Sequence, residues 1–277
     1  SYLTSMIGYV FIFFILLLEG IYFTAYNLQN AYPLFGTTLS AVTFIFLILV
    51  PVLTMKTIAE ERKQKTDQLL LTAPVSVSEI VLGKFLAVAT VYAIPVLIIC
   101  LYPMIMGKYG TVSYAMAYTA VLGFALLGFA QIAVGVFWSS VTENPVIAAV
   151  VTFIVLFVCY MITGIGSLIP DSSMASLACY MLLVLLAAVW IYHMIRNLWI
   201  AAVIGIAGEA ALAITYVVKS TLFEGSIQKF LSVFDITSHF DNFTNGILDL
   251  QGVVYFLSVI IIFLVLTVQT ITKRRWN

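Results

Sequence analysis

The stretch of sequence that decides the fold runs from Ser113 to Val141 and reads SYAMAYTAVLGFALLGFAQIAVGVFWSSV. It contains no acidic or basic residue, and Gln131 is its only side-chain amide. Crossing about 30 Å of hydrocarbon takes roughly 20 consecutive apolar residues, and this stretch is longer than that. Because a membrane span has to satisfy its own backbone hydrogen bonds, we predict that it is a transmembrane helix.

The rest of the chain has the same apolar character. Of its 277 residues, 63% are hydrophobic and only 9% are charged, and the mean hydropathy is +1.15. Soluble domains are about half apolar and about a quarter charged, so this chain has too little polar surface to fold in water. The alternating strands of outer-membrane barrels are absent. We therefore predict an all-α fold, a polytopic bundle of about eight transmembrane helices.

Polar breaks between apolar windows mark the expected spans, which are 6–28, 34–58, 79–106, 113–141, 145–169, 177–195, 198–219 and 252–272. Lys and Arg are enriched in cytoplasmic loops. Of the 12 basic residues, nine fall on one side of these spans, and Lys108, Lys219 and Lys229 fall on the other. An even number of spans then places both termini in the cytoplasm.

Local sequence chemistry supports these boundaries. Ser76 and Glu79 have the spacing of a capping box, which predicts a helix start just after Ser76. Asn144 followed by Pro145 predicts another start, because proline at the first helical position loses no hydrogen bond. The first span is too long for the apolar core of a signal peptide, and we expect a short amphipathic segment before Ser1.

The sequence carries no pattern for catalysis or metal binding. Gly83-Lys84 and Gly107-Lys108 lack the other residues of a phosphate-binding P-loop. His193 and His239 are predicted on opposite sides of the membrane, and the three cysteines have no C-x-x-C spacing, so neither a metal site nor a disulfide framework is expected. We therefore predict a chain that is not an enzyme and binds no cofactor.

The first predicted cytoplasmic loop, residues 60–84, reads EERKQKTDQLLLTAPVSVSEIVLGK. One interpretation is a solvated charged turn with a short interfacial helix. The other is a helix that docks the apolar face of Leu69–Leu71 into a cytoplasmic partner. The order E-E-R, T-x-x-L-L, T-x-P-x-S and E-I-x-x-G-K resembles the loop after the second helix in permease subunits of ABC-2 type exporters. Lys65 departs from the resemblance, because the family usually carries glycine there.

The resemblance implies that residues 59–78 form a coupling helix seated in a cleft of an ATP-hydrolysing subunit. Residues 139–144 resemble the second cytoplasmic loop of such permeases. The implied interface consists of Glu60, Glu61, Arg62, Lys63, Thr66, Asp67, Leu69, Leu70, Leu71, Thr72, Pro74, Glu143 and Asn144.

Residues 234–250, 254–258 and 273–276 resemble the gliding-motility-type branch of this superfamily, and the two extra helices within 177–219 fit that branch. The resemblance implies one permease domain over 1–277 in a bacterial plasma membrane, with 219–251 as a helical cap on the outer side. It also implies two ABC ATPase copies holding ATP and Mg²⁺, and a second permease copy or a related permease. An extracytoplasmic accessory protein and the lipid bilayer are further expected partners, and nucleic acid is not.

Three polar residues inside predicted spans are candidates for a substrate pathway. Glu19 and Glu209 lie where an unpaired charge costs roughly 2.5 kcal/mol or more. Each is either a pathway residue or a protonated or hydrogen-bonded carboxyl that faces another helix. Gln131 shares a helix face with Gly128 and Gly135, which favours close helix packing but also allows an amide that lines the pathway.

The function expected from these observations is a permease subunit that couples ATP hydrolysis in a separate subunit to substrate export. The alternative is a non-transporting, ATP-driven membrane scaffold that acts mechanically on an extracytoplasmic partner, for which the apolar segment 219–251 would be the docking site. A secondary transporter is disfavoured, because no paired, glycine-broken helices of an inverted repeat are visible.

Overall fold

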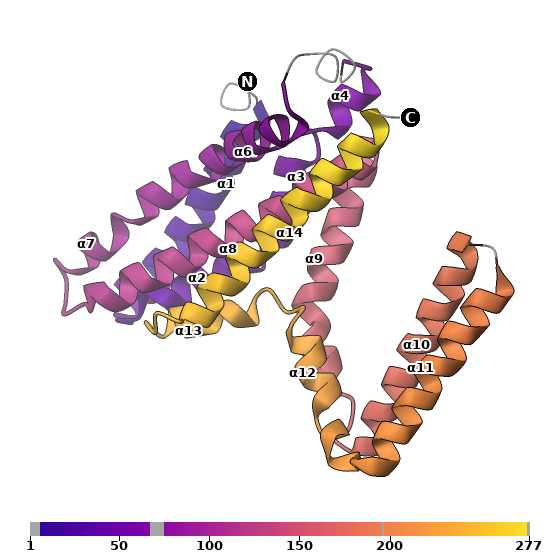
Figure 1. Cartoon of the computed structure of the whole chain (residues 1–277). Coiled ribbons are helices and arrows are strands. Elements are labelled where there is room, and N and C mark those ends of the chain that lie inside the picture. The colour runs from indigo at the N-terminus through magenta and orange to yellow at the C-terminus, as the bar shows by residue number, and fades with distance from the viewer. Residues whose placement is uncertain (1–5, 67–74, 196, 276–277) are drawn as a thin grey trace. The chain divides into compact units, whose positions relative to one another are not determined.

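The structure, a computed structural model, describes residues 6–66, 75–195 and 197–275. Every regular element in these ranges is a helix, as the sequence predicts. The chain divides into two compact units: unit 1 comprises Ser1–Val158 and Ile236–Asn277, and unit 2 comprises Cys159–Asp235. Each unit is described by itself, and Figure 1 labels its helices.

Unit 1 contains α1 (Met6–Tyr22), η2 (Phe23–Gln29), α2 (Phe35–Thr43), α3 (Phe46–Thr54), α4 (Ala59–Lys63), α6 (Val77–Ile99), α7 (Tyr102–Met106), α8 (Tyr114–Val141), the first part of α9 (Pro145–Ser167), η4 (Ser238–Phe240), α13 (Asp241–Thr244) and α14 (Leu250–Arg275). Unit 2 contains the rest of α9, α10 (Ser173–Ile195), α11 (Leu198–Val218), η3 (Ser220–Phe223) and α12 (Ser226–Ser232).

The described residues supply five to seven candidate membrane spans by length and composition. The five continuous candidates are Met6–Gln29, Val77–Met106, Tyr114–Val141, Pro145–Ser167 and Leu250–Arg274. The two bent ones are Phe35–Thr43 with Phe46–Thr54, at 60°, and Ala202–Val218 with Ser220–Ser232, at 116°. The stretch Ser173–Val189 of α10 is a further, shorter apolar helix among the described residues.

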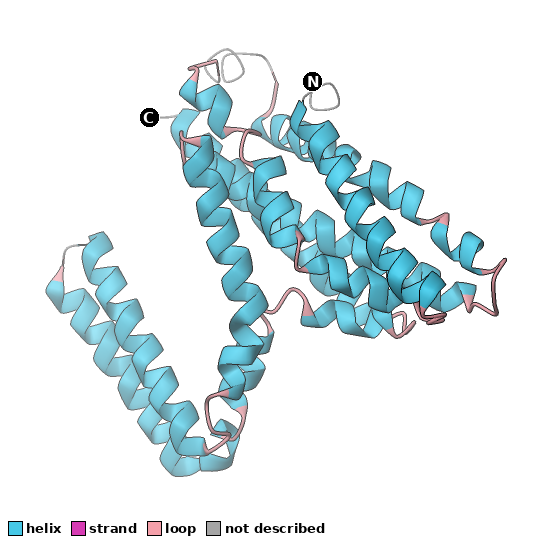
Figure 2. Cartoon of the chain, turned by 180° about the vertical axis from the view of Figure 1, so that it is seen from behind, coloured by secondary structure: helices cyan, strands magenta, loops and turns pink. Residues whose placement is uncertain are grey.

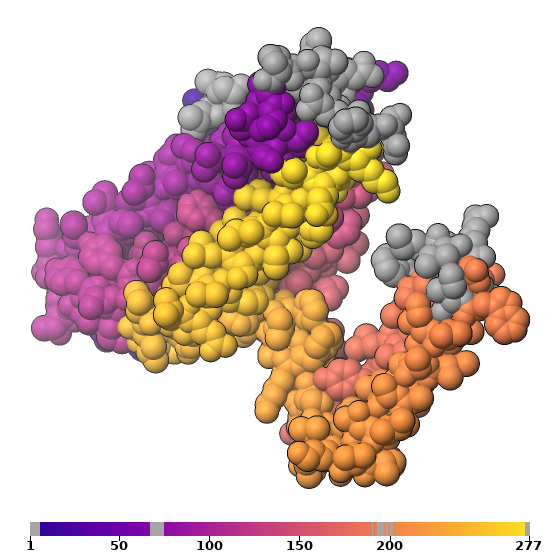
Figure 3. Space-filling view, in the orientation of Figure 1, coloured from indigo at the N-terminus to yellow at the C-terminus, as the bar shows by residue number. Residues whose placement is uncertain are grey.

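The helix α8 is the centre of unit 1. The helices α2, α3, α6, α13 and α14 pack on it, and α14 follows it along one face, where its side chains form a continuous ridge (Figure 3). Tyr92 of α6, Phe46 of α3 and Phe124 of α8 are fully buried. The Tyr92 hydroxyl donates to the Phe124 carbonyl at 2.7 Å, so the one polar atom of this aromatic cluster is satisfied without water.

The first two predicted spans are less regular than the sequence suggests. α1 continues as a π-helix over η2, where the buried Asn27 amide donates to the Tyr32 carbonyl at 2.8 Å and accepts from Thr38 Oγ1 at 2.5 Å. In the second span, backbone N–H groups between α2 and α3 donate to carbonyls three residues earlier. The Ile45 N–H, for example, donates to the Val42 carbonyl at 2.9 Å. This tighter turn gives the 60° bend.

The short helix α13 is set into the end of unit 1 that lies away from α4 (Figure 1). A Cβ atom at Gly36 of α2 would overlap the backbone of Thr244. Cβ atoms at Gly123 of α8 and Gly252 of α14 would lie 2.5 Å and 2.7 Å from the fully buried Phe243 side chain. α13 therefore fits here because three neighbouring helices present glycine.

Asp249 connects α13 to the start of α14. Its Oδ2 accepts from Asn242 Nδ2 at 2.8 Å, and its Oδ1 accepts from the Gln251 backbone N–H at 2.9 Å. The hydrogen bond from Asn242, followed by the backbone bonds, lowers the pKa of the Asp249 carboxyl. An ionised aspartate therefore caps α14.

Unit 2 is built on an antiparallel hairpin of α10 and α11. α10 ends at Ile195 and α11 begins at Leu198, which confirms the tight turn predicted there. Cβ atoms at Gly208 and Gly205 would lie 2.8 Å from Val184 and 3.2 Å from Ala188, so these glycines allow close helix contact. Elsewhere in unit 2, Thr163 Oγ1 of α9 donates to Asp235 Oδ2 at 2.7 Å.

Candidate functional site

Charged side chains of unit 1 gather at the end where α3 stops and α6 begins. α4 lies there with the last turns of α8 and α14 (Figure 1 and, from behind, Figure 2). α1 starts at the same end, because Met6 and Ile7 line a cavity with Lys56 of the α3–α4 connection. The start of α1 and the end of α14 thus lie on the same side of unit 1, which is the predicted cytoplasmic side.

Ser139, near the end of α8, holds the turn between α3 and α4. Its hydroxyl oxygen accepts hydrogen bonds from the backbone N–H groups of Ile58, at 3.0 Å, and Ala59, at 3.1 Å. The hydroxyl donates to the Met55 carbonyl at 3.1 Å. Because Ser139 is fully buried, these bonds satisfy backbone groups that water cannot reach. A side chain of α8 therefore fixes the position at which α4 starts.

Arg62 attaches α4 to the connection between α8 and α9. Its buried guanidinium donates to the Ser140 carbonyl and to Glu143 Oε1, the latter at 3.3 Å. Arg274, at the end of α14, donates to the same Glu143 oxygen at 3.2 Å. We call Arg62, Ser139, Glu143 and Arg274 the clasp. The clasp joins α4, α8 and α14.

Lys84 adds α6 to this network. Its ammonium lies 2.5 Å from Glu61 Oε1 and donates to the Thr57 carbonyl at 2.9 Å. Only 16% of the Lys84 side chain is exposed, so water screens this ion pair less than the exposed pair of Lys56 and Glu60, at 3.6 Å. Although α4 has only five residues, it is therefore attached to three long helices.

The end of α4 explains in physical terms why glycine is usual at the position of Lys65. Lys65 has a φ of 57°, in the left-handed region. Its backbone N–H donates to the Arg62 carbonyl at 3.1 Å, and the Thr66 N–H donates to the Glu61 carbonyl at 2.9 Å. This is the hydrogen-bond pattern of a Schellman helix end, whose left-handed position is usually glycine. Glycine, which the resembled family usually carries here, adopts that conformation without a steric penalty from Cβ.

Lys65→Gly should stabilise the end of α4 by up to about 1 kcal/mol, because it removes a left-handed penalty of roughly 1–2 kcal/mol while adding some chain entropy to the unfolded state. The measurement is hydrogen exchange of residues 59–66 in the purified protein. Lys65→Ala also removes the charge but keeps Cβ, and it should give no gain. If Lys65→Gly and Lys65→Ala gave equal protection from exchange, the effect would come from the loss of the charge and not from the loss of Cβ.

Comparison with known protein families matches residues 5–274 to the family described as ABC-2 family transporter protein. The chain belongs to this family. The same comparisons found no match among curated proteins and none among solved structures. Membership makes this chain an integral membrane permease subunit, and it implies an ABC ATPase as its partner.

In this ABC-2 permease, the predicted coupling residues fall into four groups. Six lie outside the described residues: Asp67, Leu69, Leu70, Leu71, Thr72 and Pro74. Glu61, Arg62 and Glu143 form the internal bonds given above, and Lys63 and Thr66 are exposed while Glu60 is half-buried. Asn144 caps α9, because its Oδ1 accepts from the Val146 N–H at 2.9 Å. Contact of any of these residues with the ATPase stays a prediction.

Sequence reasoning missed the roles of Ser139, Lys84 and Arg274. All three lie in segments that resemble the ABC-2 family, so the resemblance marked these segments as relevant without indicating the partners of the three residues. Their partners, however, are far away in sequence: Ser139 bonds to Ile58, and Arg274 bonds to Glu143 across 131 residues. A pattern within one loop does not predict such pairs.

Two of the three candidate pathway residues lie in unit 1. Glu19 is fully buried, and neither of its carboxylate oxygens has a hydrogen-bond partner among the described residues. Gln131 is also buried, and its amide oxygen has no such partner. Cβ atoms at Gly128 and Gly135 would overlap Tyr92 and Thr54, respectively, so this face of α8 serves close packing. A pathway role for Gln131 stays a prediction.

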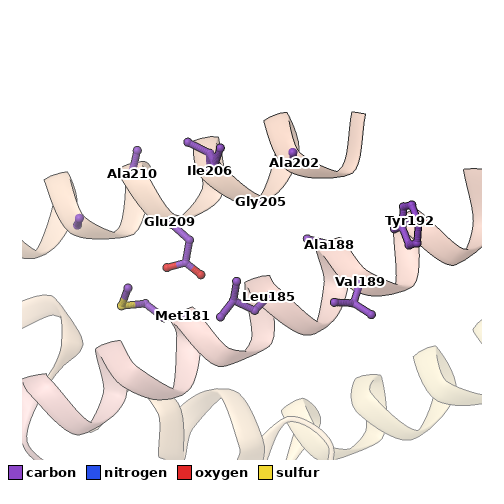
Figure 4. A pocket seen from close by; sticks show the side chains of 11 residues that line it. Met181, Leu185, Ala188, Val189, Tyr192, Ala202, Gly205, Ile206, Glu209 and Ala210 are labelled. Carbon is purple, nitrogen blue, oxygen red and sulfur yellow. The ribbon is translucent and has the colours of Figure 1, made fainter. Parts of the chain in front are cut away.

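Glu209 belongs to unit 2, on α11. It lines a groove of about 640 Å³ between α10 and α11. Figure 4 shows its carboxylate pointing from α11 towards α10, near Met181 and Leu185. Both carboxylate oxygens are shielded from water and lack a hydrogen-bond partner among the described residues. Glu209 is thus the one carboxyl among the residues that line the groove.

Proposed function

We propose that this chain is the permease subunit of an ATP-driven exporter in a bacterial plasma membrane, and that the ATPase drives it through residues 59–78. The observation that supports this proposal is the clasp. Displacing α4 would separate Ser139 and Arg62 from buried backbone partners, and leaving such groups unpaired costs about 1–3 kcal/mol each. A movement of the coupling segment is therefore passed to α6, α8 and α14 rather than absorbed locally.

In this proposal the ATPase partner holds ATP and Mg²⁺, and the permease holds no cofactor. Two ATPase subunits work with two permeases, of which the second is another copy of this chain or a related permease. The similarity of residues 234–250 to the gliding-motility-type branch supports assignment to that branch.

The decisive experiment is purification of the tagged chain from its native membranes in mild detergent, followed by reconstitution into vesicles. An ATP-binding subunit should co-purify, and the reconstituted complex should hydrolyse ATP and move a substrate. Recovery of intact chain with no ATP-binding partner from membranes cross-linked before extraction would overturn the proposal.

A second candidate is an ATP-driven scaffold that acts on an extracytoplasmic partner. The supporting observation is that the predicted outer segment 219–251 exposes large apolar side chains in each unit, which are Phe230, Val233 and Phe234 in unit 2 and Ile247 and Leu248 in unit 1. Vesicles again discriminate between the two candidates. ATP hydrolysis without movement of any lipid, peptide or glycan extracted from the native membranes would favour the scaffold.

Glu19→Gln should lower substrate-stimulated ATP hydrolysis by about tenfold, which corresponds to about 1.4 kcal/mol. Glutamine keeps the shape of the side chain but can neither ionise nor release a proton within the buried site. The measurement is ATPase activity of the reconstituted complex, with Glu19→Asp as the control that keeps the carboxyl. Unchanged turnover in both Glu19→Gln and Glu209→Gln would remove these carboxyls from the pathway.

A further inference from the structure

The groove between α10 and α11 has the size of a small-molecule site. Its volume of about 640 Å³ lies within the roughly 300–1,000 Å³ that is usual for such sites. Small residues form part of its lining, among them Ala188, Ala202 and Gly205. The groove is long, because its lining extends from Met181 to Tyr192, about 16 Å along α10 at 1.5 Å per residue.

Neither carboxylate oxygen of Glu209 has a hydrogen-bond partner among the residues that the structure describes. Between Ser173 and Val218 the sequence has one carboxylate, Glu209, and two residues that can carry a positive charge, His193 and Arg196, both near the turn. The first residue of α11, Leu198, is already about 16 Å along the helix axis from Glu209. α11 itself has no Lys, Arg or His from Leu198 to Val218.

An unpaired carboxyl in an apolar membrane segment is costly, and a cationic hydrogen-bond donor is the group that best offsets this cost. Apart from Glu209 and the Tyr192 hydroxyl, the side chains that line the groove are apolar. We propose that the groove between α10 and α11 binds a single-chain amphipathic amine, whose ammonium pairs with Glu209 and whose alkyl chain lies along Leu185, Val189 and Tyr192.

A lipid in its ordinary bilayer position would not place an amine beside Glu209. The residue lies near the middle of α11, about 16 Å from the first residue and about 13 Å from the last, whereas lipid headgroups stay at the membrane surface. The inference concerns binding alone and does not depend on ATP coupling, so it and the proposed function can fail separately.

The test uses dodecylamine carrying a diazirine on its alkyl chain, added to the full-length protein in phosphatidylcholine nanodiscs. After illumination, the labelled peptides should come from α10 and α11. Unlabelled dodecylamine should displace the probe at a concentration at least about tenfold lower than dodecanol, because a hydrogen bond to a charged group contributes about 1.5–3 kcal/mol.

Three variants separate the contribution of the Glu209 carboxylate to binding from the contribution of the volume of the groove. Glu209→Gln should bring dodecylamine and dodecanol to nearly equal potency. Ala202→Phe fills the groove and should remove most of the labelling, whereas Val203→Phe, on an exposed position next to it that does not line the groove, should leave labelling unchanged. Hydrogen exchange of α10 and α11 checks that each variant keeps the hairpin folded.

Several outcomes would overturn the proposal. Equal displacement by dodecylamine and dodecanol in the unaltered protein would show that the groove holds any alkyl chain. Displacement by phosphatidylethanolamine in the nanodisc would assign the groove to the bilayer's own lipid. Labelling that appears only in a monomeric fraction, with disulfide cross-links between two copies of an Ala202→Cys variant, would show that a second chain covers the groove.

Discussion

Arg62→Met should weaken binding of the ATPase to this permease by about tenfold to one hundredfold. The substitution removes the hydrogen bonds to the Ser140 carbonyl and to Glu143, and bonds of a charged donor contribute about 1.5–3 kcal/mol. If the ATPase binds only the attached form of α4, its affinity falls with the fraction of permease in that form. The measurement is titration of the purified ATPase against the detergent-solubilised permease.

Lys56→Met is the matched control, because it also removes one positive charge near α4 but breaks only an exposed ion pair with Glu60. Such pairs contribute less than about 1 kcal/mol. Hydrogen exchange of residues 59–66 adds a readout that does not involve the ATPase. Loss of protection with unchanged affinity would make the clasp purely structural, and unchanged protection would show that Arg62 does not hold α4.

Gly36→Ala should lower the stability of unit 1 by about 2–3 kcal/mol, at the upper end of the range for overpacked interiors. The added methyl group would overlap the backbone of Thr244, which cannot rotate away as a side chain can. α13 should therefore detach from α2 and expose Phe243. Thermal unfolding in detergent, together with hydrogen exchange of residues 238–249, measures both effects.

Gly164→Ala is the control for this substitution, because the same methyl group would have no atom within 4 Å there. In that helical position alanine should stabilise by about 0.5–1 kcal/mol. If both variants unfold at the same temperature, α13 is not held by the space at Gly36.

Sequence patterns predicted the elements whose causes are local. The capping box of Ser76 and Glu79 is present, with the Glu79 N–H donating to Ser76 Oγ at 3.3 Å and the Ser76 N–H donating to the Glu79 carboxylate at 3.0 Å. α9 begins at Pro145 after Asn144, as predicted. The apolar character of each helix could be predicted because it depends on the chemistry of consecutive residues.

Features that depend on distant residues could not be predicted in this way. The π-helix of η2 is accompanied by the hydrogen bonds that Asn27 donates to the Tyr32 carbonyl and accepts from Thr38, and the start of α4 is set by Ser139. At the candidate site, the charges of the 59–66 segment were found from sequence. The partners that make Arg62 an internal residue lie on α8 and its connection to α9, and only folding brings them together.

One oxygen atom, Glu143 Oε1, accepts from both Arg62 and Arg274, while 66% of the Glu143 side chain faces solvent. When Arg62 withdraws, Arg274 and water still neutralise the carboxylate. Loss of one arginine therefore leaves this carboxylate with a cationic neighbour. In an isolated buried ion pair, by contrast, the loss of one partner leaves an uncompensated buried charge.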